Sequence, residues 1–314
     1  KIYKSFGIKN IINLNIKKNL NFFLLFKTFF YFFLSFVKIL FFGKSWFIHK
    51  FKCKEIYFGD LIYDDYIRHN HSFLRNNLLD LKFLKILFIS IYKIIFFFDL
   101  LSKKKYNYVL SPTHTYASNS AIGMRVALRK KIKVLNILNN RLRIYKKSIE
   151  AEKIEYSLDL KFLKDKSIFD RDWEKRFDLM IKKRYQGKLK YFTAKDAYFK
   201  KKEIKKKDFL ENFDLKENSF KRIVFYAPHC FSDANHKHGK FIFDDYYSHF
   251  KATLKAAQKD TNSLWIIKIH PTSYKYNEKN LIYELIKNKK MVNVVICPHN
   301  LSTFSLIKFA DLII

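Results

Sequence analysis

The sequence predicts an α/β protein with two Rossmann-like domains, of which the first is rich in helices and the second is incomplete. Three observations lead to this prediction. After residue 222, short runs that are apolar on both faces alternate with helical patterns. Between residues 106 and 137, a strand, a loop, a helix and a second strand follow one another. Strands buried on both faces are typical of parallel sheets covered by helices, and 314 residues is a usual length for two domains.

The first predicted domain spans residues 1–205. Long helical patterns dominate it, at 19–43, 72–101 and about 167–200. Short strand-like runs lie between them, at 55–59, 106–112 and 131–137. The last two runs are separated by a loop and a helical pattern with several alanines, which completes a strand–helix–strand unit.

A linker is predicted at residues 206–221, in a polar stretch with few aliphatic side chains. The second predicted domain spans 222–314. Its strands are predicted at 222–228, 264–269 and 292–297, and its helices at 244–259, 277–290 and 302–310. The final "DLII" reads as the start of a further strand, and the chain begins with lysine rather than methionine. We therefore expect a fragment at both ends.

The formal charge of +34 suggests anionic partners such as nucleic acid, anionic lipid or phosphorylated substrates. Heavy use of Phe, Lys, Ile and Asn is also what an AT-rich coding sequence produces, so both explanations of the charge stay open. The lysines are spread along the chain and no nucleic-acid-binding motif is present, which argues against a specific nucleic-acid partner. Three distant cysteines without zinc spacing indicate reduced thiols in the cytoplasm.

The apolar helix pattern at 19–43 raises the question of a membrane. Lys27 and Lys38 interrupt it, and the longest uncharged stretch, 28–37, is too short to span a bilayer. Residues 1–50 carry nine lysines and no acid. The pattern therefore predicts a core helix of the first domain, which is compatible with peripheral attachment to an anionic inner membrane surface.

Candidate binding residues follow the predicted strands of the second domain. In open parallel sheets, ligands bind beyond the carboxyl ends of the strands. A histidine and hydroxyl residues follow each of the three complete strands, and an acid follows the first of them. The candidates are His229, Asp233, His270, Pro271, Thr272, Ser273, Ser302 and Thr303.

The His270-Pro271 pair has a mechanical reason to end a strand. Proline donates no hydrogen bond and keeps the residue before it extended. The imidazole of His270 would then donate to a phosphate oxygen, and a nearby diphosphate would favour its charged form. Ser302 or Thr303 would add the free amides of a helix N-terminus, although a serine or threonine at such a place is often only a cap.

The first domain offers two catalytic candidates, Asp60 and His114, each directly after a predicted strand. Asp60 is suited to be a general base, and it can equally be the cap of the helix that follows. Gly59 allows close backbone approach, and Arg68 could bind an anion.

The loop 228–245 contains several histidines and acids. A zinc site from His236, His238 and Asp233 lacks a further ligand at the usual spacing. We predict a loop that faces a substrate, and no metal.

Taken in chain order, five segments resemble the capsule and surface-polysaccharide biosynthesis proteins that have the GT-B glycosyltransferase architecture. The segments are "GDLIYDDYIR", "SPTHTYASNSAIGMRVAL", "FYAPHCFSDANHKHGKFIFDDYYSHFKATL", "WIIKIHPTSYKYNE" and "LSTFSLIKFADLII". The resemblance covers the chain from about residue 50 to its end and is most specific over 223–314. It implies two Rossmann-like domains that face a cleft, with the acceptor on the first domain and the nucleotide of an activated sugar on the second.

In that family the His-Pro motif and a downstream Ser/Thr motif, here His270-Pro271 and Ser302-Thr303, are associated with the nucleotide. The acidic base usually lies in the N-terminal domain, where Asp60 is the candidate. The family continues past "ADLII" with a segment bearing glycine and glutamate that completes the donor site. The resemblance therefore implies that the chain as given is truncated and cannot catalyse the reaction by itself.

The implied activity is transfer of a sugar from a nucleotide-sugar to a saccharide or lipid-linked acceptor, with no cofactor besides the donor. Asp60 would deprotonate the acceptor hydroxyl, and His270 would stabilise the leaving phosphate. Two other functions stay open: a phosphotransferase that uses a nucleotide-activated glycerol or polyol phosphate, and a non-catalytic polysaccharide-assembly protein with the same fold.

Overall fold

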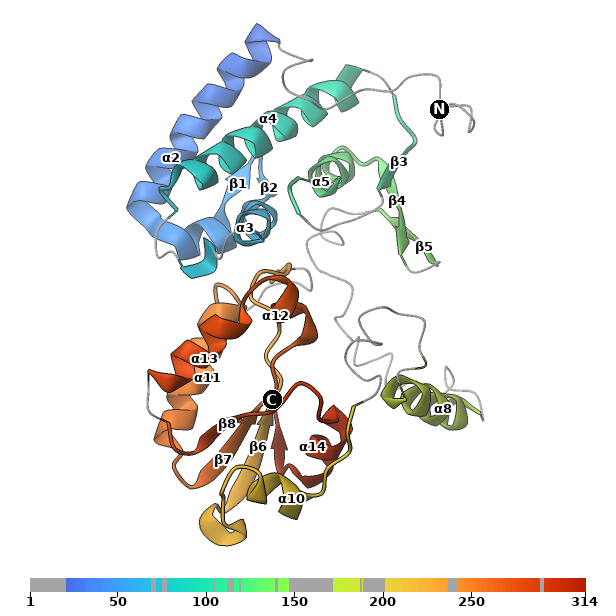
Figure 1. Ribbon diagram of the computed structural model, residues 1–314. Helices are drawn as coiled ribbons and strands as arrows, with labels where there is room; N and C mark the ends of the chain where they lie inside the picture. The colour runs from blue at the N-terminus through green and yellow to red at the C-terminus, as the bar shows by residue number, and fades with distance from the viewer. Residues whose placement is uncertain are drawn as a thin grey trace. The chain divides into compact units, whose positions relative to one another are not determined.

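The computed structural model divides into two compact units (Figure 1). Unit 1 comprises Lys1–Glu155 and His236–Lys240, and unit 2 comprises Tyr156–Asn235 and Phe241–Ile314. The structure describes residues 21–68, 72–74, 78–103, 105–111, 116–118, 120–138, 141–146, 172–186, 188, 201–236, 242–288 and 291–314. His114 and His238 lie outside these residues.

Unit 1 is rich in helices, as predicted. Its α-helices are α2 (Phe22–Lys50), α3 (Gly59–Ile67), α4 (Leu81–Lys103) and α5 (Ala121–Arg129), with a short 3-10 helix at Ser72–Leu74. Helix α2 is interrupted at Gly43, whose φ of 73° and ψ of −172° are not helical. The Phe88 ring of α4 contacts the rings of Phe29 and Phe32, at centroid distances of 5.0 and 5.6 Å, so α2 packs along α4.

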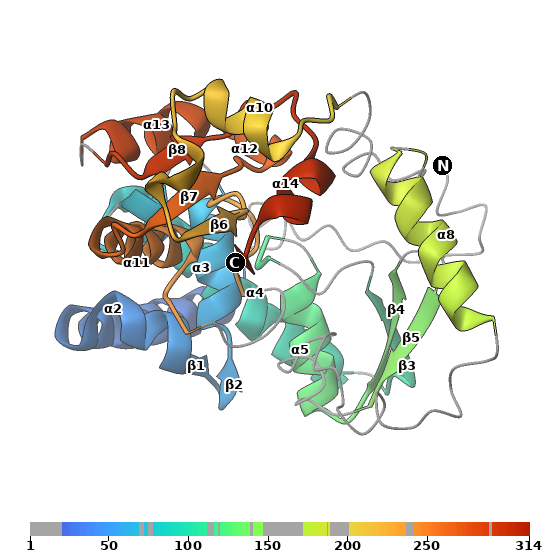
Figure 2. The same ribbon diagram turned by 90° about the horizontal axis from the view of Figure 1, so that it is seen from below.

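The strands among the described residues of unit 1 form two small sheets. Strands β1 (Lys52–Cys53) and β2 (Ile56–Tyr57) make an antiparallel hairpin. Strand β3 (Tyr108–Ser111) pairs in parallel with β4 (Lys133–Leu138), and β5 (Arg141–Tyr145) pairs antiparallel with β4. Helix α5 connects β3 to β4 and lies on one face of their sheet (Figure 2). The predicted strand–helix–strand unit is therefore confirmed, whereas the run at 55–59 belongs to the separate hairpin.

Unit 2 contains the parallel sheet that the alternating pattern predicted. Its strands are β6 (Arg222–Tyr226), β7 (Ser263–Ile267), β8 (Val294–Ile296) and β9 (Leu312–Ile313), in the order β8-β7-β6-β9. Every described pairing among them is parallel. All five residues of β7 are buried, as expected for a strand covered on both faces.

Helices cover both faces of this sheet (Figure 1). They are α10 (Lys206–Glu211), α11 (Tyr246–Lys259), α12 (Pro271–Lys275), α13 (Lys279–Lys287) and α14 (Thr303–Phe309), with a 3-10 helix at Glu217–Ser219. Helices α11 and α13 lie on one side of the strands, and α10 and α14 on the other. A charged helix, α8 (Trp173–Tyr185), occupies part of the predicted 167–200 pattern.

The prediction of a linker at 206–221 was wrong. Phe209 and Leu210 of α10 are buried in the core of unit 2, together with Ile223 and Phe225 of β6 and Leu306 of α14. Because α10 contributes to this core, residues 206–221 are an integral part of the second unit. The polar composition of the stretch hid the few apolar side chains that anchor it.

Candidate functional site

The strand order of unit 2 singles out the segment after β6. Strands β6, β7 and β8 are added in one direction, and β9 then pairs with the opposite edge of β6. The chain therefore reverses its direction across the sheet between β6 and β9. Ligands of open α/β sheets bind beyond the carboxyl ends of the strands at such a switch point, which here is the loop that begins at Ala227.

Three aromatic rings form a continuous stack in this region. The imidazoles of His229 and His270 lie 4.8 Å apart between centroids and are inclined by 21°. The ring of Tyr246 lies 4.7 Å from the His229 ring, inclined by 24°. The stack joins the ends of β6 and β7 to the start of α11, and within it the candidate residues His229 and His270 lie side by side.

The backbone around His270 explains how its ring is oriented. His270 is the N-cap of α12, with φ −61° and ψ 135°, and Pro271 occupies the first turn of the helix. The extended conformation is the one that a following proline favours, and proline is well suited to the first helical position. Nδ1 of His270 accepts a hydrogen bond from the Thr272 N–H at 3.1 Å. In the neutral ring the proton is then on Nε2, which is a hydrogen-bond donor.

Burial, and secondarily the positive charge that His229 can carry, lower the pKa of His270 to about 4. The ring is therefore neutral at pH 7 in the protein without a ligand. The predicted charged form concerned His270 beside a diphosphate, and it stays a prediction. The neutral ring can already donate to an anion through Nε2–H.

We expect this lowered pKa to make the protein less stable in acid. Unfolded histidine has a pKa near 6.5, so between pH 6.5 and 4 the unfolded chain takes up a proton that folded His270 excludes. The free energy of unfolding should fall by about 2 kcal/mol more for the wild type than for His270→Asn between pH 7.5 and 4.5. Asparagine keeps an N-cap at this position. Urea denaturation at the two pH values measures the difference, and equal losses would contradict the lowered pKa.

Glu278 holds the loop after β6 and was missed by the sequence reasoning. Its carboxylate is fully buried and accepts the N–H groups of Phe231 at 2.9 Å and Ser232 at 2.7 Å. Burial raises the pKa of Glu278, and hydrogen bonds from Ser232 and Phe231 oppose the shift. Ser273, a predicted binding residue, is also fully buried, and its hydroxyl has no hydrogen-bond partner among the described residues. Because it is buried, Ser273 is not exposed to a ligand in this structure.

Lys268 holds the loop after β8 in a similar way. Its ammonium donates to the carbonyl oxygens of Leu301 at 2.7 Å and Pro298 at 3.3 Å. The side chain is buried, and burial lowers the pKa of Lys268. These bonds fix the chain just before Ser302, whose side chain makes no capping hydrogen bond at the start of α14.

The predicted site residues are thus brought together only in part. His229, His270 and Thr272 meet at the carboxyl edge of the sheet. Ser302 and Thr303 begin α14, and within the described residues no hydrogen bond or ring contact joins them to the two imidazoles.

Asp233 lies at the rim of the same loop, with Oδ2 4.0 Å from Nε2 of His229. The thiol of Cys230 is also near, 3.4 Å from Nδ1 of His229, so these three residues group ligand-type atoms. Burial raises the pKa of the Cys230 thiol well above its usual range, which disfavours the thiolate that a metal needs. Among the described residues these three could hold a metal ion, and His236 is not part of the group.

Asp60, the predicted general base, is committed to an ion pair in unit 1. Its two carboxylate oxygens accept from the Arg125 guanidinium at 2.7 and 2.6 Å, and Arg125 also donates to the Tyr57 carbonyl at 2.6 Å. Both charged side chains are buried. The arrangement favours a structural role for Asp60. Arg68, a suggested anion ligand, lies 4.4 Å above the ring of Tyr116.

Unit 1 contains a histidine–carboxylate pair that the sequence did not predict. Oδ1 of Asp64 is 2.7 Å from Nδ1 of His236, and Oδ2 accepts the His236 N–H at 3.0 Å. Both side chains are 3% exposed. Burial raises the pKa of Asp64, and the neighbouring His236 opposes the shift. The two residues are 172 positions apart in the chain, so no local sequence pattern could have revealed the pair.

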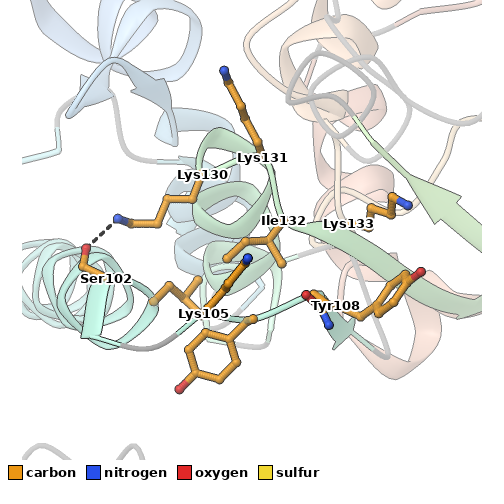
Figure 3. A pocket seen from close by; sticks show the side chains of 10 residues that line it. Ser102, Lys105, Tyr108, Lys130, Lys131, Ile132 and Lys133 are labelled. Carbon is orange, nitrogen blue, oxygen red and sulfur yellow. Dashed lines mark hydrogen bonds between the residues drawn. The ribbon is translucent and has the colours of Figure 1, made fainter.

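Unit 1 also contains an open cavity of about 750 Å³ (Figure 3). It lies at the amino ends of β3 and β4, and its lining residues include Lys105, Tyr106, Tyr108, Lys130, Lys131 and Lys133. The Lys130 ammonium donates to the Ser102 hydroxyl at 2.5 Å. The lysines would attract an anion, although the cavity is at the end of the strands opposite to the one where parallel sheets usually bind ligands.

Comparisons with protein-family models, with curated proteins and with solved structures gave no match to this chain.

Proposed function

We propose that the chain is part of a GT-B-type glycosyltransferase of surface-polysaccharide biosynthesis, and that unit 2 binds the nucleotide diphosphate of a nucleotide-sugar. The two-domain GT-B arrangement, with the acceptor on the first domain, is part of this proposal. The observation that carries it is the stacked pair of histidines, His229 and His270, at the switch point of a parallel sheet.

The chemistry of the pair suits a diphosphate. The Nε2–H of neutral His270 is a fixed donor, because the Thr272 N–H occupies Nδ1. A donor at this place would stabilise the negative charge that develops on the leaving phosphate as the glycosidic bond to it breaks. The carboxylate of Glu278 keeps the backbone of Phe231 and Ser232 in place beside it.

The candidate base for the acceptor hydroxyl changes from Asp60 to His236. Asp60 already accepts two hydrogen bonds from Arg125. His236 has its Nδ1 against the Asp64 carboxylate, so in the neutral ring the basic lone pair is on Nε2. Because the side chain is only 3% exposed, the proposal requires that His236 become accessible when the acceptor binds. The carboxylate would stabilise the imidazolium that forms on proton transfer.

Nucleotide binding to the complete protein tests the proposal. Calorimetric titration with UDP, GDP, ADP and CDP should show binding of at least one of them. His270→Asn should weaken that binding by about tenfold or more, because a hydrogen bond to a charged phosphate oxygen contributes about 1.5–3 kcal/mol. His249→Gln, on α11 of the same unit, is the matched control and should leave the affinity unchanged.

Two results would contradict the proposal: no affinity for any of the four nucleotides, or equal affinity of the wild type and His270→Asn. Thermal unfolding of each variant separates loss of binding from loss of fold. If CDP binds best, CDP-glycerol should be compared with nucleotide-sugars, because the same donor would serve an activated polyol phosphate.

A further inference from the structure

Helix α2 exposes large aromatic side chains along one face. The exposed fractions are 86% for Phe22, 65% for Phe26, 59% for Phe29, 57% for Phe30, 64% for Phe33 and 81% for Phe41. Single exposed apolar residues are common, whereas a contiguous set usually marks an interaction surface. These six residues are called the phenylalanine face below.

The helical period explains how the face is separated from the core. Phe22, Phe26, Phe29 and Phe33 recur at intervals of four, three and four residues and lie on one side of the helix, with Phe30 and Phe41 beside them. Leu24, Thr28, Ser35 and Ile39, at intervals of four, seven and four, are buried on the opposite side. Phe88 of α4 contacts Phe32 and also Phe29, so one edge of the phenylalanine face lies against α4. Helix α2 is therefore anchored to unit 1 through its buried side and this edge, and its other exposed aromatic residues turn outward.

Lysines flank the phenylalanine face. Lys27 and Lys38 are eleven residues apart, which is three helical turns, so they lie on the same flank. The Lys27 ammonium is 4.0 Å from the centroid of the Phe23 ring. Burial lowers the pKa of Lys54, and the positive charges of Lys27 and Lys130 lower it further. Positive charge from the β1–β2 hairpin and from the end of α5 therefore gathers near this flank. No acidic residue occurs in α2.

We propose that the phenylalanine face of α2 docks on an anionic lipid bilayer, with the helix axis in the plane of the membrane. The aromatic rings would enter the boundary between headgroups and acyl chains, and Lys27 and Lys38 would meet the phosphates. The positive charge favours an anionic membrane over a second copy of this chain as the partner of the phenylalanine face. Two copies, each with a formal charge of +34, would bring two positive surfaces together. This inference does not depend on the proposed function.

A transmembrane orientation is the main rival. Of the described helices, α2 is long and apolar enough to cross a membrane by length and composition alone. A span would place Lys27 and Lys38, and the side of α2 that packs on α4, within the hydrocarbon. The in-plane orientation keeps both lysines at the headgroups and leaves the contact with α4 intact.

Co-sedimentation of the full chain with liposomes tests the docking. Vesicles of phosphatidylcholine with 30% phosphatidylglycerol should bind the protein at least about tenfold more tightly than vesicles of phosphatidylcholine alone. The triple variant Phe26→Ser/Phe30→Ser/Phe33→Ser should reduce binding at least about tenfold. Phe177→Ser, at an exposed phenylalanine of α8, is the control and should leave binding unchanged.

The charge and the orientation are tested separately. Lys27→Glu/Lys38→Glu should abolish the preference for phosphatidylglycerol, and an alkaline carbonate wash should release the wild type from the vesicles. Retention after the wash would overturn the in-plane orientation. Equal binding to both vesicle types, or full binding by the triple serine variant, would overturn the docking surface itself. Self-association of the wild type without lipid that the serine variant lacks would assign the face to a second copy instead.

Discussion

Gly59→Ala should destabilise unit 1 by at least about 3 kcal/mol. A Cβ at Gly59 would lie 1.9 Å from the carbonyl oxygen of Phe47 and 3.1 Å from that of Ile48. Both neighbours are backbone atoms of the final turns of α2, and the side chains of Phe47 and Ile48 are fully buried. The helices α2 and α3 would have to move apart, because backbone cannot rotate away as a side chain can. Urea denaturation followed by circular dichroism measures the loss.

Two other glycines provide the controls for this substitution. At Gly123 a Cβ would meet the Phe97 ring at 2.9 Å. This contact is with a half-buried side chain rather than with backbone, so Gly123→Ala should cost less. At Gly43 a Cβ meets nothing within 4 Å, but φ of 73° with ψ of −172° is a region almost restricted to glycine, so Gly43→Ala should cost about 1–3 kcal/mol of backbone strain. If Gly59→Ala is no more harmful than Gly43→Ala, the close approach of α2 to α3 is incorrect.

The parts of the structure that could be predicted are those with local patterns. Strand β7 is a run of residues buried on both faces, and such a run among helical patterns leaves few alternatives to a parallel sheet. Gly59 directly after a strand signalled a close backbone approach, which the structure contains. His270 could be placed because proline restricts the residue before it, and the observed ψ of 135° agrees.

The parts that could not be predicted depend on contacts between distant charged residues. Glu278 and Lys268 look in the sequence like solvent-exposed residues, yet both are buried and hold loops in place. Hydropathy assigns such residues to the surface, because a charge is buried only when a partner satisfies it. The partner of Asp60 is 65 residues away along the chain, which no spacing rule covers. Because this distant partner is not apparent from the sequence, an acid directly after a strand looked like a catalytic base.

Arg125→Met should destabilise unit 1 by about 3–5 kcal/mol, because it leaves the Asp60 carboxylate buried without its counter-ion. Asp60→Asn should also destabilise unit 1, but by less than Arg125→Met. The amide can still accept one of the two hydrogen bonds that the carboxylate accepts from Arg125. The unfolding midpoint in urea measures both losses.

The double variant Asp60→Leu/Arg125→Met separates the structural role of Asp60 from a catalytic one. If the carboxylate only neutralises Arg125, replacing both charges with apolar side chains should recover most of the stability that Arg125→Met loses, as removal of a whole buried ion pair often does. Transfer activity, measured with the complete protein, should then recover as well. If stability returns while activity does not, Asp60 takes part in the reaction, and His236 does not replace it as the base. The two readouts therefore distinguish the candidates without requiring a structure of the acceptor complex.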